Sequence, residues 1–398
     1  MRTSVFLLIA VVGGYFVYHL WFSPEEATPE DYEFVGGEEN PSADAEAAAD
    51  QAADADGSSE ANRRRDKRTS IIIGGSRGGT RGSNSARPNA IPLDDDPREA
   101  EAWELMDRLK DARNASDQAE ATKLVDRIWN EYEHTDVGRL LSFEKGNEAI
   151  NRFRALGRTP QGYQAAQEAR KYLTPALFLG DDVVDKGQRE ALRKRLRQMA
   201  DEMLFTGRHI DGVDQLYRTK RGDTLDVLCR KVFPQKWGIR AAPGLVMAVN
   251  RIRRPQDLRA DVNIRVPIGT PKLIVAKHEF RLYFLLDGAY VRDWPVGLGA
   301  EASQTPLGTF KIRSKLVNPD WFPRQGVKIP FGNPRNILGN RWMGFADTAE
   351  FTGFGIHGTT KPQSIGKRES SGCVRMGRND VEELFSWTPR GAEVEIRR

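Results

Sequence analysis

The sequence predicts a multidomain chain that ends in an all-β domain, and three observations lead to this fold class. An unbroken apolar run lies at the N-terminal end, a long stretch of biased composition follows it, and the hydrophobic period changes from helical to strand-like near residue 271. We therefore expect a transmembrane signal anchor at 1–22, a disordered linker at 23–97, an α-helical domain at 98–210, a small βααβ module at 215–269 and an all-β domain at 271–398.

The composition is typical of a soluble globular protein. Apolar residues make up 39% and charged residues 29% of the 398 residues, and the net charge of +4 is small for this length and does not indicate a nucleic-acid partner. Two cysteines exclude a disulfide framework, and neither their spacing nor the five histidines indicate a metal site. We expect no cofactor.

The apolar run at 5–22 (VFLLIAVVGGYFVYHLWF) has the length of a membrane-spanning helix. Its eighteen residues span about 27 Å at ~1.5 Å per residue, close to the ~30 Å hydrocarbon core of a bilayer. Arg2 precedes the run, Trp21 and Phe22 end it, and no small-residue cleavage site follows. We expect an uncleaved inner-membrane anchor with the remainder in the periplasm of the cell envelope. A cleaved signal peptide is the alternative.

The predicted linker at 23–97 cannot bury enough apolar surface to offset its chain entropy. Residues 25–60 are rich in Asp, Glu and Ala and contain no Lys or Arg, whereas RRRDKR at 63–68 is basic and 74–88 is rich in Gly and Ser. We interpret this stretch as a flexible spacer. Contact of the basic cluster with phospholipid or an anionic wall polymer is the alternative.

Helical periodicity begins after residue 98. Trp103, Met106 and Leu109 recur every three residues, and similar spacing continues at 124–129, 140–156, 163–172 and 190–205. Short helices joined by brief loops predict a small bundle or an array of helix pairs. Packing, or contact with a protein partner, is the role expected for this region.

The segment 217–233 (YRTKRGDTLDVLCRKVF) predicts a strand, a tight turn at 221–224 and an apolar helix that Asp223 or Thr224 caps. A second apolar helix (244–250) and a strand (263–267) follow. This order, with GDTL at the first turn, resembles a LysM module, a family that binds N-acetylglucosamine-containing glycans such as peptidoglycan. The long link PQKWGIRAAP and Ala260-Asp261 before the last strand depart from the family. Cys229, on the apolar stripe of the first helix, is expected to be a packed core thiol.

Strand patterns occupy the C-terminal third of the chain. The stretch 272–299 predicts three short strands, with a turn near Phe280 and a hairpin at Asp287-Gly288, and TPLGTFKI (305–312) predicts another. A Pro/Gly/Asn-rich excursion (318–340), FGIHG, the SSGC loop and a terminal strand (392–396) follow. Before that last strand we expect a short helix, DVEELFSW, capped by Asn379 with Glu382 in a capping box.

Two of these stretches carry residue types suited to nucleophilic catalysis. A cysteine nucleophile needs a base, a group that orients the base, and N–H donors for an oxyanion. In FGIHG a strand presents His357, and Gly358 lets the chain turn at once. An imidazole beside the Cys373 thiol would lower the pKa of the thiol and give an ion pair. A buried, inert cysteine and a structural histidine are the alternative on the residues alone.

The residues around the cysteine suit the same chemistry. In SSGCVRM, Gly372 removes side-chain bulk beside Cys373, so that the N–H groups of Ser371, Gly372 and Cys373 can converge on a carbonyl oxygen. Arg375, two residues on, lies on the same side as Cys373 if the strand continues. It is then placed to bind a substrate carboxylate or to lower the thiol pKa.

The stretch TPLGTF, NPRNILGNRW, FGIHGTTKPQSIGKRESSGCVRM and GAEVEI resembles the YkuD-type L,D-transpeptidase catalytic domain, in its IHGT/SxGCxRM branch. The resemblance implies a β-sandwich and a penicillin-insensitive peptidoglycan cross-linker that carbapenems acylate. It makes Cys373 the nucleophile and His357 its base. It implies that the carbonyl of Gly358 orients the imidazole, where other members place a serine. Gly372 and Cys373 N–H groups form the oxyanion hole.

The resemblance also assigns substrate contacts. Arg375 helps to hold the donor or the loop, and Ser371 replaces a histidine that many members carry, so that proton transfer rests on His357 alone. Trp321, Trp342 and Phe345 either line the donor groove or pack in the core.

By this resemblance Cys373 attacks the third residue of a donor stem tetrapeptide, D-alanine leaves, and a neighbouring stem amine resolves the thioester into a 3→3 cross-link. Water as acceptor would make an L,D-carboxypeptidase, and a lipoprotein lysine would make an anchoring enzyme. An inactive cell-wall-binding anchor is the alternative from another class. A papain-type protease would place its cysteine before its histidine, which is opposite to the order here. The expected partners are peptidoglycan stem peptides and glycan strands.

Overall fold

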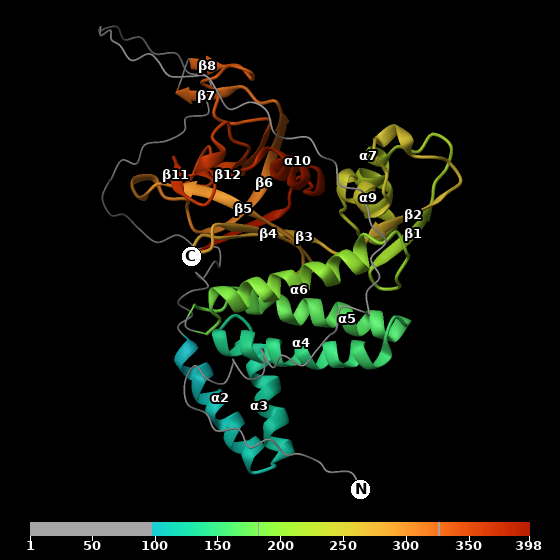
Figure 1. Cartoon of the computed structure of the whole chain (residues 1–398), viewed down its shortest axis with the longest axis vertical. Coiled ribbons are helices and arrows are strands. Elements are labelled where there is room, and N and C mark those ends of the chain that lie inside the picture. Colours follow the sequence, from blue (N-terminus) through green and yellow to red (C-terminus); the bar gives the residue numbers. More distant parts are fainter. Residues whose placement is uncertain (1–97, 182, 325–326) are drawn as a thin grey trace. The chain divides into compact units, whose positions relative to one another are not determined.

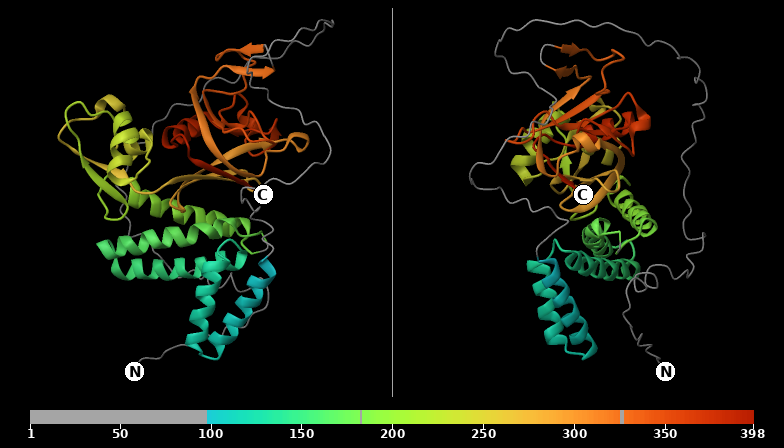
Figure 2. Two further views of the ribbon diagram at one scale, coloured as in Figure 1. Left: turned by 180° about the vertical axis from the view of Figure 1, so that it is seen from behind. Right: turned by 90° about the vertical axis from the view of Figure 1, so that its left-hand side faces the viewer.

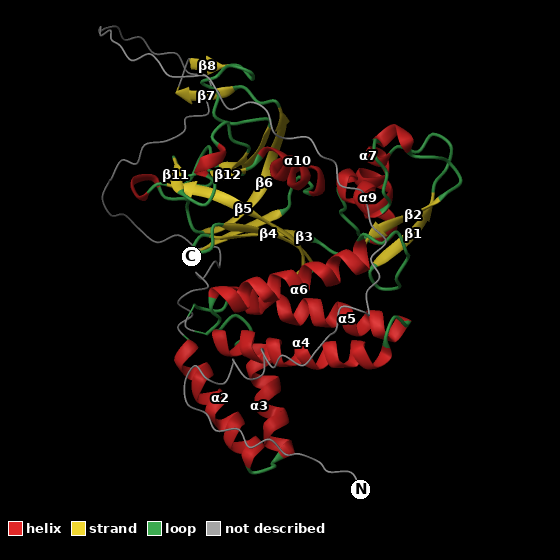
Figure 3. Ribbon diagram, in the orientation of Figure 1, coloured by secondary structure: helices red, strands yellow, loops and turns green. Residues whose placement is uncertain are grey.

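The computed structural model describes residues 98–181, 183–324 and 327–398 (Figure 1). The expected anchor at 1–22 and linker at 23–97 lie outside these residues. Within the described part of the chain, every helix is too short or too polar to cross a membrane. Figure 3 shows that helices come first along the chain, and that the strands gather in its C-terminal part.

Five helices form the region after residue 98. They are α2 (Glu99–Asn114), α3 (Gln118–Glu131), α4 (Asp136–Leu156), α5 (Pro160–Leu173) and α6 (Lys186–Leu204). The last four begin at a side chain that accepts a backbone N–H of the first turn, namely Asp117, Thr135, Thr159 and Asp185. Both views of Figure 2 show α4, α5 and α6 side by side. The helices of this region were predicted, and the starts of α3, α4, α5 and α6 follow from these caps.

Buried and partly buried polar contacts join these helices to the β-rich part. Arg170 of α5 donates from Nε and Nη2 to the carbonyl of Tyr290, at 3.1 and 2.8 Å. Arg193 of α6 pairs with Glu279 at 2.5 Å, and Arg292 pairs with Asp201 of α6 at 3.0 Å. The helices therefore contact the β-rich part through fixed side-chain pairs as well as through apolar packing.

The segment after α6 has the predicted order of strand, helices and strand. Strand β1 (Asp214–Arg218) pairs antiparallel with β2 (Asn263–Pro267), and between them lie α7 (Leu225–Val227), a π-helical turn (Leu228–Val232), α8 (Phe233–Trp237) and α9 (Pro243–Val249). Helix α8 occupies the long link noted in the sequence. Thr224 caps α7, and Asp223 accepts the N–H of Lys220 instead. Cys229 lies in the core of this segment, and burial raises the pKa of its thiol to about 12.

The strands of the C-terminal part form one continuous sheet in the order β11-β5-β12-β10-β9-β6-β13-β3-β4. Its members are β3 (Pro271–Ala276), β4 (Arg281–Leu286), β5 (Ala289–Gly299), β6 (Gly308–Val317), β9 (Arg341–Phe345), β10 (Gly355–His357), β11 (Arg368–Ser370), β12 (Val374–Met376) and β13 (Glu393–Arg397). Because β5 pairs with both β12 and β4, the sheet closes on itself. The two faces of the expected β-sandwich are thus one closed sheet. A separate hairpin, β7 (Trp321–Arg324) and β8 (Val327–Ile329), lies outside it.

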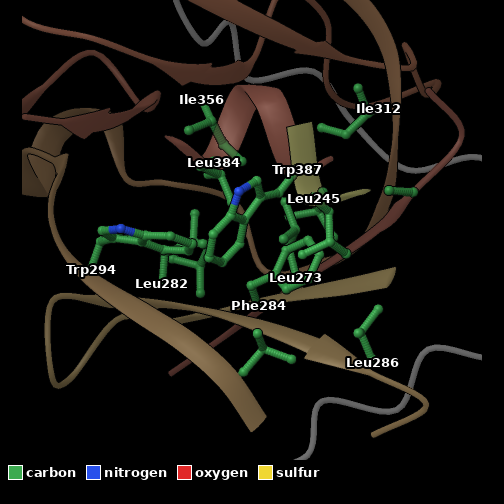
Figure 4. Close-up of a cluster of buried hydrophobic side chains, with 14 of the residues drawn as sticks. Leu245, Leu273, Leu282, Phe284, Leu286, Trp294, Ile312, Ile356, Leu384 and Trp387 are labelled. Carbon is green, nitrogen blue, oxygen red and sulfur yellow. The ribbon is translucent and has the colours of Figure 1, made fainter. Parts of the chain in front are cut away.

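The core of the closed sheet is built around Trp387, at the end of α10 (Arg378–Trp387). Its ring lies 5.8 Å from Phe284 and 6.0 Å from Trp294 between centroids, and Leu245 of α9 reaches the same cluster (Figure 4). Phe205 stacks on it from the helical region, at 5.5 Å. One indole therefore joins the sheet, the module and the helices.

The prediction that Asn379 caps this helix is wrong. Helix α10 begins at Arg378, one residue after Gly377, which follows directly on the end of β12, so Asn379 already lies inside the first turn. Glu382 forms no capping box and instead accepts the side-chain amide of Asn340. The predicted cap, Asn379, lies two residues after Gly377, which is the actual N-cap.

Replacement of Trp387 by alanine is expected to lower the free energy of unfolding by about 3–5 kcal/mol, because it removes a fully packed ring from the core. Urea unfolding of the purified chain, monitored by circular dichroism, measures the change in the free energy of unfolding. Trp103→Ala is the matched control, since Trp103 is 38% exposed and should cost less than about 1 kcal/mol. Equal losses in the two variants would contradict this account of the core.

Candidate active site

Three adjacent strands place the predicted site residues. In the register of the sheet, His357 of β10 lies opposite Arg375 of parallel β12 and opposite Trp342 of antiparallel β9. Cys373 directly precedes β12, and it lies in an apolar cluster with Trp342, whose indole stacks on the imidazole of His357. The charge of Arg375 acts on both the thiol and the imidazole.

The imidazole of His357 is buried and held from two sides. Its Nδ1 lies 2.5 Å from the carbonyl oxygen of Gly358, a contact that places the proton on Nδ1 and leaves Nε2 as the basic nitrogen. The indole of Trp342 stacks on the ring, with centroids 5.8 Å apart and planes 28° apart. Burial lowers the pKa of His357 to about 4; the Gly358 carbonyl opposes this shift, and the charge of Arg375 adds to it.

The thiol of Cys373 is also buried. The residue is 6% exposed and lies in a small apolar cluster with Leu338 and Trp342, against which Trp321 and Ile337 pack. Burial raises the pKa of Cys373 to about 11, although a backbone contact with Gly355 and the charge of Arg375 lower it. In this state burial disfavours the expected thiolate–imidazolium pair. The desolvation of both groups outweighs their favourable neighbours, so that the thiol and the imidazole are both neutral at pH 7.

The loop before the cysteine is organised by Ser370, which sequence reasoning missed. Its hydroxyl donates to the carbonyl of Cys373 at 2.6 Å and accepts the N–H of Gly372 at 3.2 Å. The Gly372 N–H, expected in the oxyanion hole, is thus already bonded in this state. Ser371, expected to contact substrate, is exposed at the tip of the loop. The doubled serine in SSGC was a signal, but only the loop geometry shows which serine is buried.

Gly372 is required by two independent features of this loop. Its φ of +109° lies in a region that side chains rarely adopt, and a Cβ added there would lie 2.3 Å from the ring of Phe354. Phe354 comes from the same segment that leads into β10. The glycine therefore lets the cysteine loop and the histidine strand approach each other closely.

The three aromatic candidates have different environments. Phe345 stacks on Phe310 at 5.2 Å and belongs to the main core. Trp342 supports the imidazole, as described, and Trp321 of β7 packs against the thiol cluster. The indole N–H of Trp321 and Nε of Arg375 are buried without a hydrogen-bond partner among the described residues. These two groups are donors that a bound peptide could satisfy.

Asn340 is a further residue that the sequence analysis did not single out. It precedes β9, donates to Glu382 of α10, and its Oδ1 lies 3.1 Å from the position that a Cβ on Gly358 would take. A side chain at position 358 would therefore meet Asn340, so this close approach favours glycine at the turn whose carbonyl contacts His357. In the sequence, Asn340 belongs to the stretch NPRNILGNRW, which contributes only to the family resemblance. Among the described residues, no group of three or more His, Cys, Asp or Glu side chains could hold a metal ion.

Comparison with known proteins identifies the domain. Residues 270–396 match the model of the YkuD L,D-transpeptidase catalytic domain. The chain is 37% identical over 129 residues to "Putative L,D-transpeptidase YqjB" of Bacillus subtilis. The aligned residues cover 32% of this chain and 72% of that protein. This chain belongs to the YkuD L,D-transpeptidase family. A protein of the same description named YkuD in Bacillus licheniformis is 32% identical over 187 residues, which cover 46% of this chain and 98% of that protein, and YkuD of B. subtilis is 29% identical over 189 residues.

The raised pKa of Cys373 predicts how the thiol of this family member reacts with iodoacetamide at different pH values. Because only the thiolate reacts and burial raises the Cys373 pKa to about 11, the alkylation rate should rise about tenfold per pH unit from 7 to 10. Peptide mapping by mass spectrometry separates Cys373 from Cys229. In urea the rate at pH 7 should increase, as the thiol returns to its ordinary pKa of about 8.5. A plateau below pH 8 in the folded chain would contradict a neutral thiol.

Gly372→Ala is expected to disrupt the site, because the new methyl group would overlap Phe354 and separate the cysteine loop from β10. The altered burial of Cys373 should change its alkylation rate at pH 7 by at least tenfold. Gly366→Ala is the matched control, since Gly366 has a comparable φ of +80° but an added Cβ there has no neighbour within 4 Å. If both variants alkylate like the parent, the contact with Phe354 is not what positions the thiol.

Proposed function

We propose that this chain is a peptidoglycan L,D-transpeptidase that forms 3→3 cross-links through a thioester on Cys373. The observation that carries the proposal is the indole of Trp342, which packs with Cys373 and stacks on His357, whose Nδ1 meets the Gly358 carbonyl. His357 also lies opposite Arg375 in the pairing of β10 with β12. This is the arrangement of nucleophile, base and orienting group that acyl transfer by cysteine requires. Membership of the L,D-transpeptidase family supports the same reaction class.

The first half-reaction would form the thioester. Nε2 of His357 takes the thiol proton of Cys373 as sulfur attacks the carbonyl carbon of the third residue of a donor stem tetrapeptide. The oxyanion of the tetrahedral intermediate receives hydrogen bonds from the N–H of Cys373 and, once Ser370 releases it, from that of Gly372. The intermediate collapses, the C–N bond breaks, and the imidazolium returns the proton to the departing amine of D-alanine.

The second half-reaction would transfer the acyl group. The side-chain amine of the third residue in a neighbouring stem attacks the thioester carbonyl, and His357 takes the proton of that amine. The C–S bond then breaks, and the thiol of Cys373 is restored with the proton from the imidazole. Arg375, whose guanidinium Nε has no hydrogen-bond partner in the part of the chain that the structure describes, would bind a donor carboxylate.

Substrate entry must accompany this chemistry, because the thiol is 6% exposed. Trp321 packs on the thiol cluster from the β7–β8 hairpin, which stands outside the closed sheet. We infer that a donor peptide displaces this indole and accepts its N–H. Replacing Trp321 by the bound peptide would also bring polar groups to the site, which would favour the charged forms of Cys373 and His357.

We also propose that the segment at 215–269 is a LysM module that binds glycan strands, and that the motifs place the chain in the IHGT/SxGCxRM branch. The alignments with the two YkuD proteins are longer than the catalytic-domain match, which ends two residues before the C-terminal residue of this chain. The extra shared length therefore lies before the catalytic domain, where this segment is. The anchor at 1–22 and a periplasmic catalytic domain complete the proposal, since the substrate lies outside the inner membrane.

Incubation of the purified chain with tetrapeptide-containing muropeptides tests the reaction. Mass spectrometry should show 3→3 cross-linked dimers and free D-alanine. Cys373→Ser and His357→Gln should each reduce dimer formation by at least 100-fold, because the first removes the thiol nucleophile and the second its base. Cys229→Ala is the control, since its thiol lies in the module core and should leave the activity intact.

The products also separate the alternatives. Tripeptides without dimers would show that water is the acceptor and that the chain is an L,D-carboxypeptidase. Unchanged muropeptides together with binding to isolated glycan would support an inactive wall-binding anchor and would overturn the proposal.

A further inference from the structure

A pocket lies in the catalytic domain, with a volume of about 540 Å³ and a lining that includes neither Cys373 nor His357. Its walls are the turn between β3 and β4, the loop after β5, the start of β11 and Arg398. Lys277, Arg368 and Arg398 supply basic groups to the lining, and Glu301 supplies an acidic one. The predominance of positive charge makes this pocket suited to an anionic ligand.

Lys277 brings a charged side chain into a buried position in this lining. The residue is 6% exposed, and its Nζ donates to the carbonyl of Thr305 at 2.7 Å. Burial lowers the pKa of its ammonium group, and the charges of Arg368 and Arg398 lower it further. A buried ammonium group beside two guanidinium groups is destabilised by desolvation and by repulsion, and an anion would relieve both.

Two of the neighbouring carboxylates are paired with other side chains. Glu279 pairs with Arg193 at 2.5 Å, and Glu369 faces Lys367 at 3.8 Å. In the described residues, neither Lys277 nor Arg368 forms an ion pair with a carboxylate. The guanidinium of Arg368 lies over the ring of Phe280 at 5.3 Å, so that its in-plane N–H groups stay available at the edge of the stack.

The pocket is connected to the cysteine loop by printed hydrogen bonds. The N–H of Ala300 and the hydroxyl of Ser303 both donate to the carbonyl of Ser370, at 2.9 and 3.2 Å. Ala300 and Ser303 flank Glu301, which lines the pocket. Ser370 in turn bonds the N–H of Gly372 and the carbonyl of Cys373 through its hydroxyl. One residue therefore separates the wall of the pocket from the catalytic segment.

We propose that this pocket binds the carboxylate of a peptide ligand, and that its occupancy changes the reactivity of Cys373 through Ser370. A carboxylate fits better than a phosphate, because Glu301 would repel a dianion but can pair with the ammonium group of a peptide. The proposal rests on the proposed function only for the source of the ligand, since wall stem peptides carry both groups. The binding site itself stands on the charges and geometry of this chain.

Calorimetric titration of the Cys373→Ser chain tests the site without turnover. The probes are alanyl-alanine, its C-terminal amide, and inorganic phosphate. Saturable binding of alanyl-alanine, with none of the amide, is expected. Arg368→Gln should weaken that binding at least tenfold, as it removes a charge-assisted hydrogen bond. Arg230→Gln, an exposed arginine of the module that pairs with Asp226, is the matched control and should bind as the parent does.

Several outcomes would overturn this assignment. They are equal binding of dipeptide and amide, equal affinity in the Arg368→Gln chain, or binding of phosphate alone. Circular dichroism confirms that each variant is folded, and because Arg368 is exposed, its replacement should leave the fold intact.

The coupling to Cys373 is measured separately, by alkylation of the parent chain at pH 9. Saturating alanyl-alanine should change the rate at Cys373 by at least threefold, and the Arg368→Gln chain should show no such change. An unchanged rate in the parent would overturn the coupling. Dipeptide binding can persist when muropeptides are not cross-linked, so failure of this proposal and failure of the proposed function are distinguishable.

Discussion

The parallel pairing of β10 with β12 is the constraint on which the candidate site depends. Parallel strands cannot be joined by a hairpin, so the chain leaves His357, crosses through β11 and the serine loop, and returns beside its own starting point. A shift of this pairing by one residue would send the thiol to the opposite face. The glycine at 372 and the buried hydroxyl of Ser370 are what the return crossing needs to end in this register.

Burial gives this site a neutral resting state. Leu338 and the two indoles exclude water from the sulfur, and the cost of charge in that environment keeps the proton on the thiol. A neutral thiol is also less exposed to oxidation than a thiolate. Reactivity would then depend on the ligand, because a bound peptide replaces apolar contacts by polar ones at the moment when charge develops. Such a site would react selectively with ligands that can displace the indole of Trp321 and reach the thiol.

Local patterns predicted much of this fold. The Asp287-Gly288 hairpin forms with positive φ at both residues, as that dipeptide favours, and Thr224, one of the two residues predicted to cap the first helix of the module, caps α7. The cysteine and histidine motifs predicted the strands that carry them. Closure of the sheet through the pairing of β5 with β12 could not be predicted, because these two strands lie far apart in the sequence and no local pattern pairs them.

The polar details were also beyond the sequence. The choice between Ser370 and Ser371 depends on which hydroxyl turns inward, and the protonation of the thiol depends on how completely neighbours cover it. The Asn379 cap failed because the capping pattern lies just inside a helix that had already begun.

Tyr290 of β5 gives the helices before the catalytic domain a structural role. Its carbonyl accepts Arg170, and its N–H donates to the hydroxyl of Thr174, so that both of its main-chain groups are completed by the region at 98–210. Apolar side chains of α5 and α6 extend the same core. A shortened recombinant protein that begins at residue 270, where the family match starts, would present this unfinished surface to water. Fragments intended for crystallography or inhibitor screening should retain α5 and α6.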